Sequence, residues 1–352
     1  MRVAFFPPLS TLIENPYWAI LSESLSEFNV EIINNTPIIF STRWLLRHYS
    51  KIDIIHLQFI RPFYISGKSR KLRLIHVIIF TLNLLLIRYF GIQLIMTVHD
   101  PEPPLEVNPK WVDTLAHWIA VNLSNKVIVH CAEAENLVNR KFNRKRKIFI
   151  VDHPNYINSY PNSITKKEAR KKLGLDESKL VFGFVGGIRK NKGVEQLIYA
   201  FKALRQIDSQ LIIAGKTSKS SIDYLAELKK ISEGDDRIFF FPNFIAPEEI
   251  QIYLNAVDIM VLPFSKILTS GSTILSLSFK KPVIVPKTGC LPELIKSQYG
   301  WLYEPDDLSS LIGAMESAAG SSHEAVGQAA FEMITSCTPS KFAKQTYDVY
   351  FN

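Results

Sequence analysis

The sequence is poor in cysteine and in metal-binding patterns. Its three cysteines, Cys131, Cys290 and Cys337, lie far apart and form no C-x-x-C pair, so we expect a reduced, cytoplasmic setting. The sequence has no H-E-x-x-H motif and no D-x-D triplet, which excludes two common metal-binding patterns. We therefore expect a protein that needs neither a metal nor another cofactor.

Acidic charge is scarce relative to basic charge. The chain of 352 residues has 41 Lys and Arg against 33 Asp and Glu, which gives a net charge of +8. This excess suits a polyanionic partner, namely a nucleic acid, an anionic lipid or a phosphorylated substrate. The 47% hydrophobic and 21% charged residues indicate a globular protein, and the length favours two domains.

Strand-like apolar segments alternate with helix-like segments in both halves of the chain, a pattern typical of parallel, doubly wound sheets. The stretch Asp152–Ser163 is rich in turn formers and separates the halves. We predict an N-terminal domain over 1–155, a C-terminal domain over 156–338, and a last helix over 339–352 that returns to the N-terminal domain. A ligand is expected in the cleft between them, at strand C-terminal ends.

Two turns in the C-terminal half have the composition of phosphate-binding sites. Gly186–Gly193 is basic and lies between a predicted strand and a predicted helix, and Thr269–Thr273 is a hydroxyl and glycine cluster at a helix start. Free backbone N–H groups at a helix start bind anions, and phosphate is the usual guest. The two turns together predict a nucleoside diphosphate ligand.

The chain resembles the GT-B glycosyltransferases, an α/β class in which two doubly wound Rossmann-like domains face each other across a cleft. The resemblance covers nearly the whole chain and is more specific in the C-terminal half. It is carried by Phe184–Gly186 with Lys192 and Gly193, Ile212–Gly215, Leu254–Pro263, Lys281–Pro286 and Gly289–Ile295.

A narrower resemblance is to bacterial exopolysaccharide β-mannosyltransferases, which act on lipid-linked oligosaccharides with GDP-mannose. Thr97–Asp100, His153–Tyr156 and Leu268–Ser272 carry it. It implies an enzyme that moves a hexosyl group from GDP-mannose or a UDP-sugar to a hydroxyl of a lipid-linked oligosaccharide. Many retaining GT-B enzymes have two Glu residues eight positions apart on the donor helix; those places are Leu268 and Ser276 here, so we expect inversion.

The candidate donor residues come from both turns. Metal-free transferases stabilise the leaving diphosphate with helix N-termini and fixed cations. The candidates for donor and phosphate binding are Gly187, Arg189, Lys192, Ser270, Gly271, Ser272, Thr273 and Glu293. The alternatives are an exposed lysine at 192, N-capping by the hydroxyls and a capping carboxylate at 293. We expect the nucleobase to contact the backbone near Phe244 and Ile245.

An inverting transfer needs a base for the acceptor hydroxyl. Asp100 is the first candidate, and His99 beside it is expected to position the donor; the alternative is a turn cap and a core histidine. Glu106, His153 and Tyr156 are the candidates for acceptor or interdomain contacts, with hinge packing as the alternative for the last two.

The segment Lys68–Phe90 begins with basic residues and continues as an apolar run that is shorter than the roughly 20 residues of a membrane span. It is expected either to contact an anionic membrane surface or to be a buried helix. We expect a protein at the inner face of the plasma membrane.

The alternative functions are a retaining transferase with a soluble acceptor, a nucleotide-sugar epimerase, and a nucleic-acid or nucleotide-binding module. The scarcity of interleaved basic and aromatic residues argues against the last of these.

Overall fold

The computed structural model of the protein describes residues 1–11, 15–65, 69–100, 110–217 and 221–351. Its chain divides into two compact units, which we call unit 1 (Met1–Pro154 with Thr338–Asn352) and unit 2 (Asn155–Cys337). Both junctions lie one residue before the positions expected from the sequence. The C-terminal segment is thus part of the unit that contains the N-terminus.

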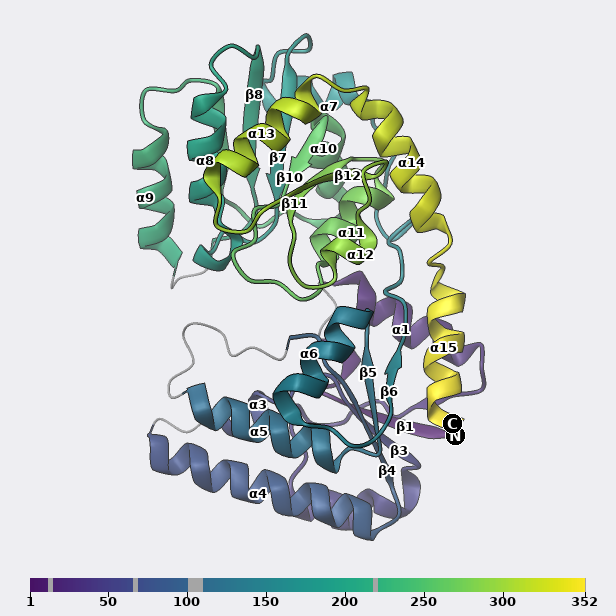
Figure 1. Ribbon diagram of the computed structural model, residues 1–352. Helices are drawn as coiled ribbons and strands as arrows, with labels where there is room; N and C mark the ends of the chain where they lie inside the picture. Colours follow the sequence, from purple (N-terminus) through teal and green to yellow (C-terminus); the bar gives the residue numbers. More distant parts are fainter. Residues whose placement is uncertain (12–14, 66–68, 101–109, 218–220, 352) are drawn as a thin grey trace. The chain divides into compact units, whose positions relative to one another are not determined.

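Unit 1 is built on a parallel sheet. Within its described residues, six strands pair in the order β2-β1-β3-β4-β5-β6; Figure 1 labels all of them except β2. They are β1 (Arg2–Phe6), β2 (Glu31–Ile32), β3 (Ile54–Leu57), β4 (Gln93–Thr97), β5 (Lys126–Val129) and β6 (Ile148–Ile150). Every residue of β3 and β5 is buried. Burial on both faces explains why such strands read as nearly continuous apolar runs.

The helices of unit 1 follow the strands in alternation. They are α1 (Pro16–Ser26), α2 (Thr42–His48), α3 (Pro62–Ile65), α4 (Arg70–Tyr89), α5 (Lys110–Leu123), α6 (Ala132–Phe142) and α15 (Pro339–Phe351), with the 3-10 turns η1 (Leu9–Thr11) and η2 (Tyr49–Lys51). The last helix, α15, packs on α1, where the rings of Tyr17 and Phe342 lie 5.2 Å apart. Nζ of Lys126 in β5 donates to the carbonyl oxygen of Val349 at 2.7 Å. The C-terminal helix therefore completes the core of unit 1.

Unit 2 has a second parallel sheet with a different order. Six strands within its described residues pair as β12-β11-β10-β7-β8-β9. They are β7 (Leu180–Val185), β8 (Ser209–Ala214), β9 (Ile238–Phe241), β10 (Ile259–Val261), β11 (Val283–Pro286) and β12 (Gly300–Tyr303). The winding reverses between β7 and β10, which are neighbours in the sheet. Open parallel sheets bind ligands at such a point, outside the carboxyl ends of the strands.

The helices of unit 2 are α7 (Lys166–Leu173), α8 (Val194–Ala203), α9 (Ile222–Ser232), α10 (Ile250–Ala256), α11 (Gly271–Ser278), α12 (Leu291–Leu294), α13 (Leu308–Ala319) and α14 (His323–Thr335), with η3 (Lys190–Lys192) and η5 (Pro247–Glu249). Two of them begin next to the reversal of winding. The turn Gly186–Gly193 joins β7 to α8, and α11 begins on the segment that follows β10.

Candidate functional site

The turn after β7 is held so closely against its neighbours that two positions require glycine. A Cβ atom at Gly215 would lie 2.1 Å from the carbonyl oxygen of Gly186, and one at Gly193 would lie 2.0 Å from that of Pro263. Gly193 also has a φ of +64°, a backbone conformation that side chains disfavour. The basic turn therefore rests directly on the chain that leaves β10.

The two phosphate-type turns lie side by side in unit 2. A Cβ atom at Gly186 would lie 3.5 Å from Oγ of Ser272 in the first turn of α11. The backbone N–H of Ser265 donates to the carbonyl oxygen of Asn191, in the basic turn, at 3.3 Å. One ligand at the carboxyl edge of β7 and β10 can thus contact both turns.

The start of α11 is a capped helix terminus with hydroxyl groups around it. Oγ of Ser270 accepts from the backbone N–H of Thr273 at 3.1 Å, as an N-cap does. Oγ1 of Thr273 is buried and has no hydrogen-bond partner within the part of the chain that the structure describes. The hydroxyl oxygen of Tyr156 would lie 3.3 Å from a Cβ atom at Gly271. Capping satisfies one N–H group, and other N–H groups of the first turn are available to an anion.

Two cations of the basic turn have no acidic partner within the described residues. Lys192 is half-buried, with Nζ 4.7 Å from the centre of the Phe264 ring. Burial, and then the charge of Arg189, lower the pKa of Lys192 to about 8. Arg189 is exposed, and its Nε would lie 3.6 Å from a Cβ atom at Gly187. An unpaired, partly desolvated lysine gains most from a bound phosphate, because the anion restores the lost solvation of the charge.

The nucleobase candidates lie after β9. Phe244 is exposed, and Nζ of Lys216 lies 5.7 Å from the centre of its ring. Ile245 follows it and is half-buried. Lys216 leaves β8 beside the basic turn, where its carbonyl oxygen accepts from the backbone N–H of Ile188 at 3.0 Å. Lys216 was not among the site residues predicted from the sequence. A lysine directly after Gly215, at the end of a strand, could have indicated a further basic residue of the donor site.

Glu293 lies in the short helix α12 and is exposed. The loop before Glu293 packs closely on the chain leading to α11. A Cβ atom at Gly289 would lie 2.5 Å from the carbonyl oxygen of Ile267, and Gly289 has a φ of +56°. The backbone N–H of Cys290 donates to the carbonyl oxygen of Leu268 at 2.8 Å. This packing ties α12 to the segment that carries the hydroxyl cluster.

In unit 1, His99 follows β4 inside a group of aromatic rings. Its Nε2 lies 2.8 Å from Oε1 of Gln58, and its ring centre lies 5.3 Å from that of Tyr17 and 5.2 Å from that of Trp18. Burial, and then the neighbouring histidines, hold the pKa of His99 well below its usual range. The imidazole is therefore neutral at pH 7, donates through Nε2 to Gln58, and keeps the lone pair of Nδ1.

Four histidines gather at the carboxyl edge of this sheet, on β3 and on the segments that follow β4, β5 and β6. His56 contacts Oγ1 of Thr97 at 2.8 Å, and the ring of His130 lies 5.5 Å from that of His99 and 5.4 Å from that of His153. Burial lowers the pKa of His56 and of His153 to about 3, and lowers that of His130 as well. The group is a set of neutral hydrogen-bonding rings and holds no cation at pH 7.

Asp100 is exposed and lines a cavity of about 30 Å³ together with His99, Gln58, Arg61 and His117. A cavity of this size holds about one water. A carboxylate at the exposed end of a buried strand has the access that a base for an acceptor hydroxyl needs. Its role as the base stays a prediction.

A buried carboxylate not expected from the sequence supports this cavity. Asp113 of α5 accepts from the hydroxyl of Tyr64 at 2.6 Å and from Nε of Arg61 at 3.1 Å. Burial opposes ionisation of Asp113, but the hydrogen bond from His117 and those contacts outweigh it and lower its pKa. Its position on the apolar face of α5, four residues before His117, is the signal that sequence reasoning missed.

Of the three acceptor or interdomain candidates, two belong to different units of the structure. His153 belongs to unit 1, where Nδ1 lies 2.9 Å from the carbonyl oxygen of Pro154. Tyr156 belongs to unit 2, where its backbone N–H donates to Oγ of Ser278 at 3.0 Å. Glu106 lies outside the described residues. Tyr156 thus adjoins the hydroxyl cluster of α11, a placement that the sequence did not indicate.

An apolar surface covers one side of unit 1. In Figure 1 helices α4 and α5 run along this side, and they pack on each other. The exposed large apolar side chains on them are Leu72, Ile75, Ile78, Ile79, Leu82, Leu85 and Tyr89 of α4 and Trp111, Leu115 and Trp118 of α5. The stretch Lys71–Tyr89 has a mean hydropathy of 1.7 with 28% of it buried, so by length and composition alone it can cross a membrane. The helix is longer than the apolar run of the sequence, because it extends through the basic and polar residues at both ends.

Among the described residues no group of three or more His, Cys, Asp or Glu is placed to hold a metal ion. Independence from metals stays a prediction.

Two Rossmann-like units, each with a parallel six-stranded sheet within its described residues, define the GT-B fold, as the sequence predicted. The model of the family "Glycosyl transferases group 1" matches residues 165–332. This stretch contains the basic turn, the hydroxyl cluster and α12. The family match and the fold together support a GT-B glycosyltransferase.

Curated relatives are similar over about half of the chain. An uncharacterized glycosyltransferase of Methanocaldococcus jannaschii is 26% identical over 186 residues, 51% of this chain and 47% of the relative. The lipopolysaccharide core biosynthesis mannosyltransferase LpsB of Rhizobium meliloti is 27% identical over 157 residues, 42% of this chain and 44% of LpsB. The chain thus spans less than half the length of these relatives.

Solved structures resemble the whole chain. Sucrose-phosphate synthase of Thermosynechococcus elongatus has a TM-score of 0.76 at 16% identity and covers 100% of this chain and 98% of its own. Anabaena HepE, solved in complex with UDP and glucose, has a TM-score of 0.73 at 16% identity, with 99% and 98% covered. At this identity the likeness shows the fold alone.

Proposed function

We propose that the protein is an inverting glycosyltransferase that moves a hexosyl group from GDP-mannose or a UDP-sugar to a hydroxyl of a lipid-linked oligosaccharide. One observation carries the proposal: the basic turn Gly186–Gly193 and the start of α11 adjoin at the carboxyl edge of β7 and β10. The binding of UDP and of UDP-glucose by Anabaena HepE, and the mannosyl transfer by LpsB of Rhizobium meliloti, support a sugar-nucleotide donor.

Unit 2 supplies what a departing nucleoside diphosphate needs. Breaking the bond between sugar C1 and the phosphate oxygen places negative charge on the diphosphate. Arg189 and Lys192 offer fixed positive charge, and the backbone N–H groups of Gly271 and Ser272 lie at the start of α11. Preorganised donors of this kind stabilise the charge as it develops, without a metal ion. The exposed ring of Phe244 is available to stack on the base.

Unit 1 supplies the base. Asp100 takes the proton from the acceptor hydroxyl as that oxygen attacks C1, and neutral His99 positions a sugar hydroxyl through the lone pair of Nδ1. The donor helix has no carboxylate at Leu268 or Ser276, which favours inversion over a retaining reaction. Analysis of the anomeric configuration of the product decides between the two, and a retained configuration refutes this part of the proposal.

The donor assay is a thermal-shift panel of GDP-mannose, UDP-glucose, other sugar nucleotides and the free nucleotides. A ligand that binds only the folded state raises the melting temperature by mass action. We expect one sugar nucleotide to stabilise the protein and to turn over with a lipid-linked acceptor. The variant Asp100→Asn should keep that stabilisation and lose transfer. A protein that no sugar nucleotide stabilises contradicts the proposal.

We also propose that the surface of α4 and α5 contacts an anionic membrane, where a lipid-linked acceptor resides. Exposed apolar side chains are unusual over so wide a patch. The chain has no acidic residue from Ile54 to His99, and Lys71 of α4 is exposed. Arg43 and Arg47 of α2, which packs on α4, are exposed as well. An apolar face with basic borders is typical of helices that lie in the interface of anionic lipids.

Vesicle sedimentation tests the membrane contact. The protein should sediment with vesicles that contain phosphatidylglycerol and much less with phosphatidylcholine vesicles. The double variant Ile78→Glu with Leu82→Glu should stay in the supernatant, because two carboxylates then face the lipid. Ile222→Glu is the matched control, since Ile222 of unit 2 is 60% exposed, as Leu82 is. Equal sedimentation of all three proteins refutes the contact.

A further inference from the structure

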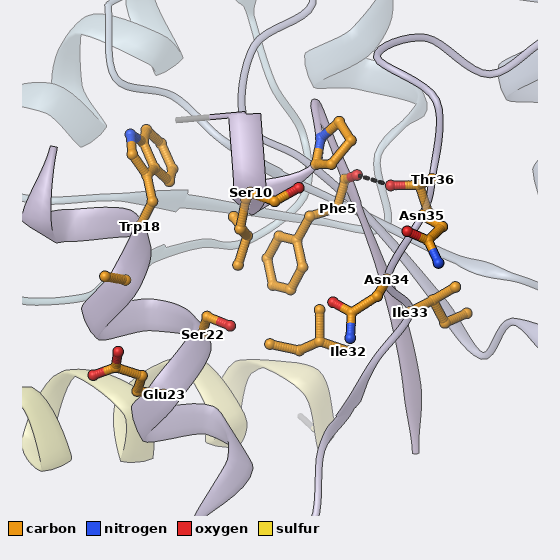
Figure 2. A pocket seen from close by; sticks show the side chains of 13 residues that line it. Phe5, Ser10, Trp18, Ser22, Glu23, Ile32, Ile33, Asn34, Asn35 and Thr36 are labelled. Carbon is orange, nitrogen blue, oxygen red and sulfur yellow. Dashed lines mark hydrogen bonds between the residues drawn. The ribbon is translucent and has the colours of Figure 1, made fainter. Parts of the chain in front are cut away.

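A cavity of about 190 Å³ opens on unit 1 between α1 and the chain that leaves β2 (Figure 2). It is not part of the donor site or of the small cavity at Asp100. Pockets for drug-sized ligands enclose roughly 300–1,000 Å³, and this volume corresponds to about six waters in the liquid. A single sugar ring suits such a space better than a nucleotide does.

The cavity has an apolar floor and a polar rim. Phe5, Leu9 and Trp18 contribute buried rings and an aliphatic side chain to its lining. The polar side chains of the rim are Ser10, Ser22, Glu23, Asn34 and Asn35. None of these five side chains has a hydrogen-bond partner among the residues that the structure describes. An apolar surface bordered by solvent-accessible hydroxyl, amide and carboxylate groups that no other side chain occupies matches a ring with C–H faces and hydroxyl edges.

The two sides of the rim come from different elements. Figure 2 shows Ser22 and Glu23 on helix α1 and Asn34 on the chain opposite. Asn35 has a φ of +64°, a left-handed conformation that asparagine tolerates better than most residues. A hydroxyl-rich ligand between the two walls can donate to Glu23 and both donate to and accept from Asn34.

The charge of the lining restricts the ligand. Among the described residues that line the cavity there is one carboxylate, Glu23, and no Lys, Arg or His. A phosphate or a uronic acid would meet a like charge without a compensating cation, which is unfavourable. The lining therefore disfavours an anionic saccharide.

The cavity adjoins the proposed base through one side chain. Trp18 lines the cavity, and its ring packs edge to face on that of His99, with centres 5.2 Å apart. His99 directly precedes Asp100. We infer that the cavity binds a neutral, non-reacting hexose unit of the acceptor, next to the unit whose hydroxyl reacts. The assignment to the acceptor rests on the proposed function, whereas saccharide binding by the cavity does not.

The test uses the full chain without a donor. Saturation-transfer NMR titrations with methyl glycosides of mannose, glucose and galactose measure binding, and methyl glucuronide is the charged comparison. We expect at least one neutral glycoside to bind with a millimolar Kd and the glucuronide to bind more weakly. Asn34→Ala should raise that Kd about 3–10-fold, the effect of one lost hydrogen bond. Ala19→Phe should abolish binding, because exposed Ala19 lines the cavity and a ring there fills it.

The control variant is Asn139→Ala on α6, an exposed asparagine outside the lining. It should bind the glycoside as the unaltered chain does. Thermal melting checks that each variant folds. Unchanged binding by Ala19→Phe, or no binding of any neutral glycoside, overturns the inference and leaves the donor assay unaffected. If the protein binds a neutral glycoside but no sugar nucleotide stabilises it, the cavity remains a saccharide site and its assignment to the acceptor is overturned.

Discussion

Lys192 should make nucleotide binding depend on pH between 7 and 9. Its pKa of about 8 arises from burial, then from repulsion by Arg189, and no carboxylate pairs with it within the described residues. A bound diphosphate favours the charged form, so binding near pH 8 should be accompanied by proton uptake. The phosphates themselves titrate near pH 6, so they do not mask the effect.

The magnitude follows from the pKa. A lysine with a pKa of about 8 is roughly 90% charged at pH 7 and roughly 10% charged at pH 9. If only the charged form binds, the Kd for the nucleoside diphosphate rises about tenfold over that range, or about 1.4 kcal/mol. Lys192→Ala removes a charge-assisted hydrogen bond worth about 1.5–3 kcal/mol. The Kd at pH 7 should therefore rise roughly 10–150-fold, and its dependence on pH should disappear.

Isothermal titration with UDP and GDP at pH 7, 8 and 9 measures both effects. Two buffers with different ionisation enthalpies at pH 8 report the proton uptake. Lys229→Ala on α9 is the matched control, because Lys229 is an exposed lysine of the same unit, and it should keep the slope. A Kd that is constant from pH 7 to 9 in the unaltered chain, or an equal slope in Lys192→Ala, refutes the role of Lys192.

The remaining predictions concern stability and the turn. His56 has a pKa of about 3 when folded against about 6.5 unfolded. The unfolded state therefore binds the extra proton below pH 6.5, and stability falls as pH falls, by at most about 1.4 kcal/mol per pH unit for this group. His56→Gln should flatten urea midpoints measured from pH 7 to 4.5, and an unchanged slope contradicts this reasoning. Asp113→Asn should lower the free energy of unfolding in urea by about 3–5 kcal/mol, because it breaks the buried ion pair with Arg61. The exposed Asp348→Asn should cost less than about 1 kcal/mol, and similar costs for the two would count against the buried network. Gly193→Ala places a methyl group on the carbonyl oxygen of Pro263. Nucleotide affinity and melting temperature should both fall, and an unaltered Kd would show that the turn does not contact the ligand.

The sequence predicts the fold well because both sheets are covered on two faces. Strands such as β7 and β8 are buried along nearly their whole length, so they are visible as apolar runs between helices. Polar elements are harder to find. Helix α7 is mostly charged and has no apolar run that would predict it. Its start is marked by a capping box, in which the side chains of Thr165 and Glu168 each accept from the other residue's backbone N–H. This pattern was not used to predict a helix from the sequence.

The candidate donor turns could be predicted because each is a continuous segment with its own chemistry. The groups around Asp100 could not, because they come from separate strands and helices. His99 and His130 become neighbours only through the order of the strands, and Asp113 meets Arg61 only through the packing of α5. The cavity beside α1 has the same origin, because Ser22 and Asn34 belong to different elements.

Helix α15 gives the chain an order of assembly. Tyr350, two residues from the end, contacts Nδ1 of His56 through its hydroxyl group at 2.9 Å, and the carbonyl oxygen of Tyr350 accepts from Lys126. A ribosome therefore completes the sequence of unit 2 before it supplies the last helix of unit 1. Unit 1 can therefore finish folding only after unit 2 has been synthesised, and removal of α15 would expose the apolar surface of α1 to water.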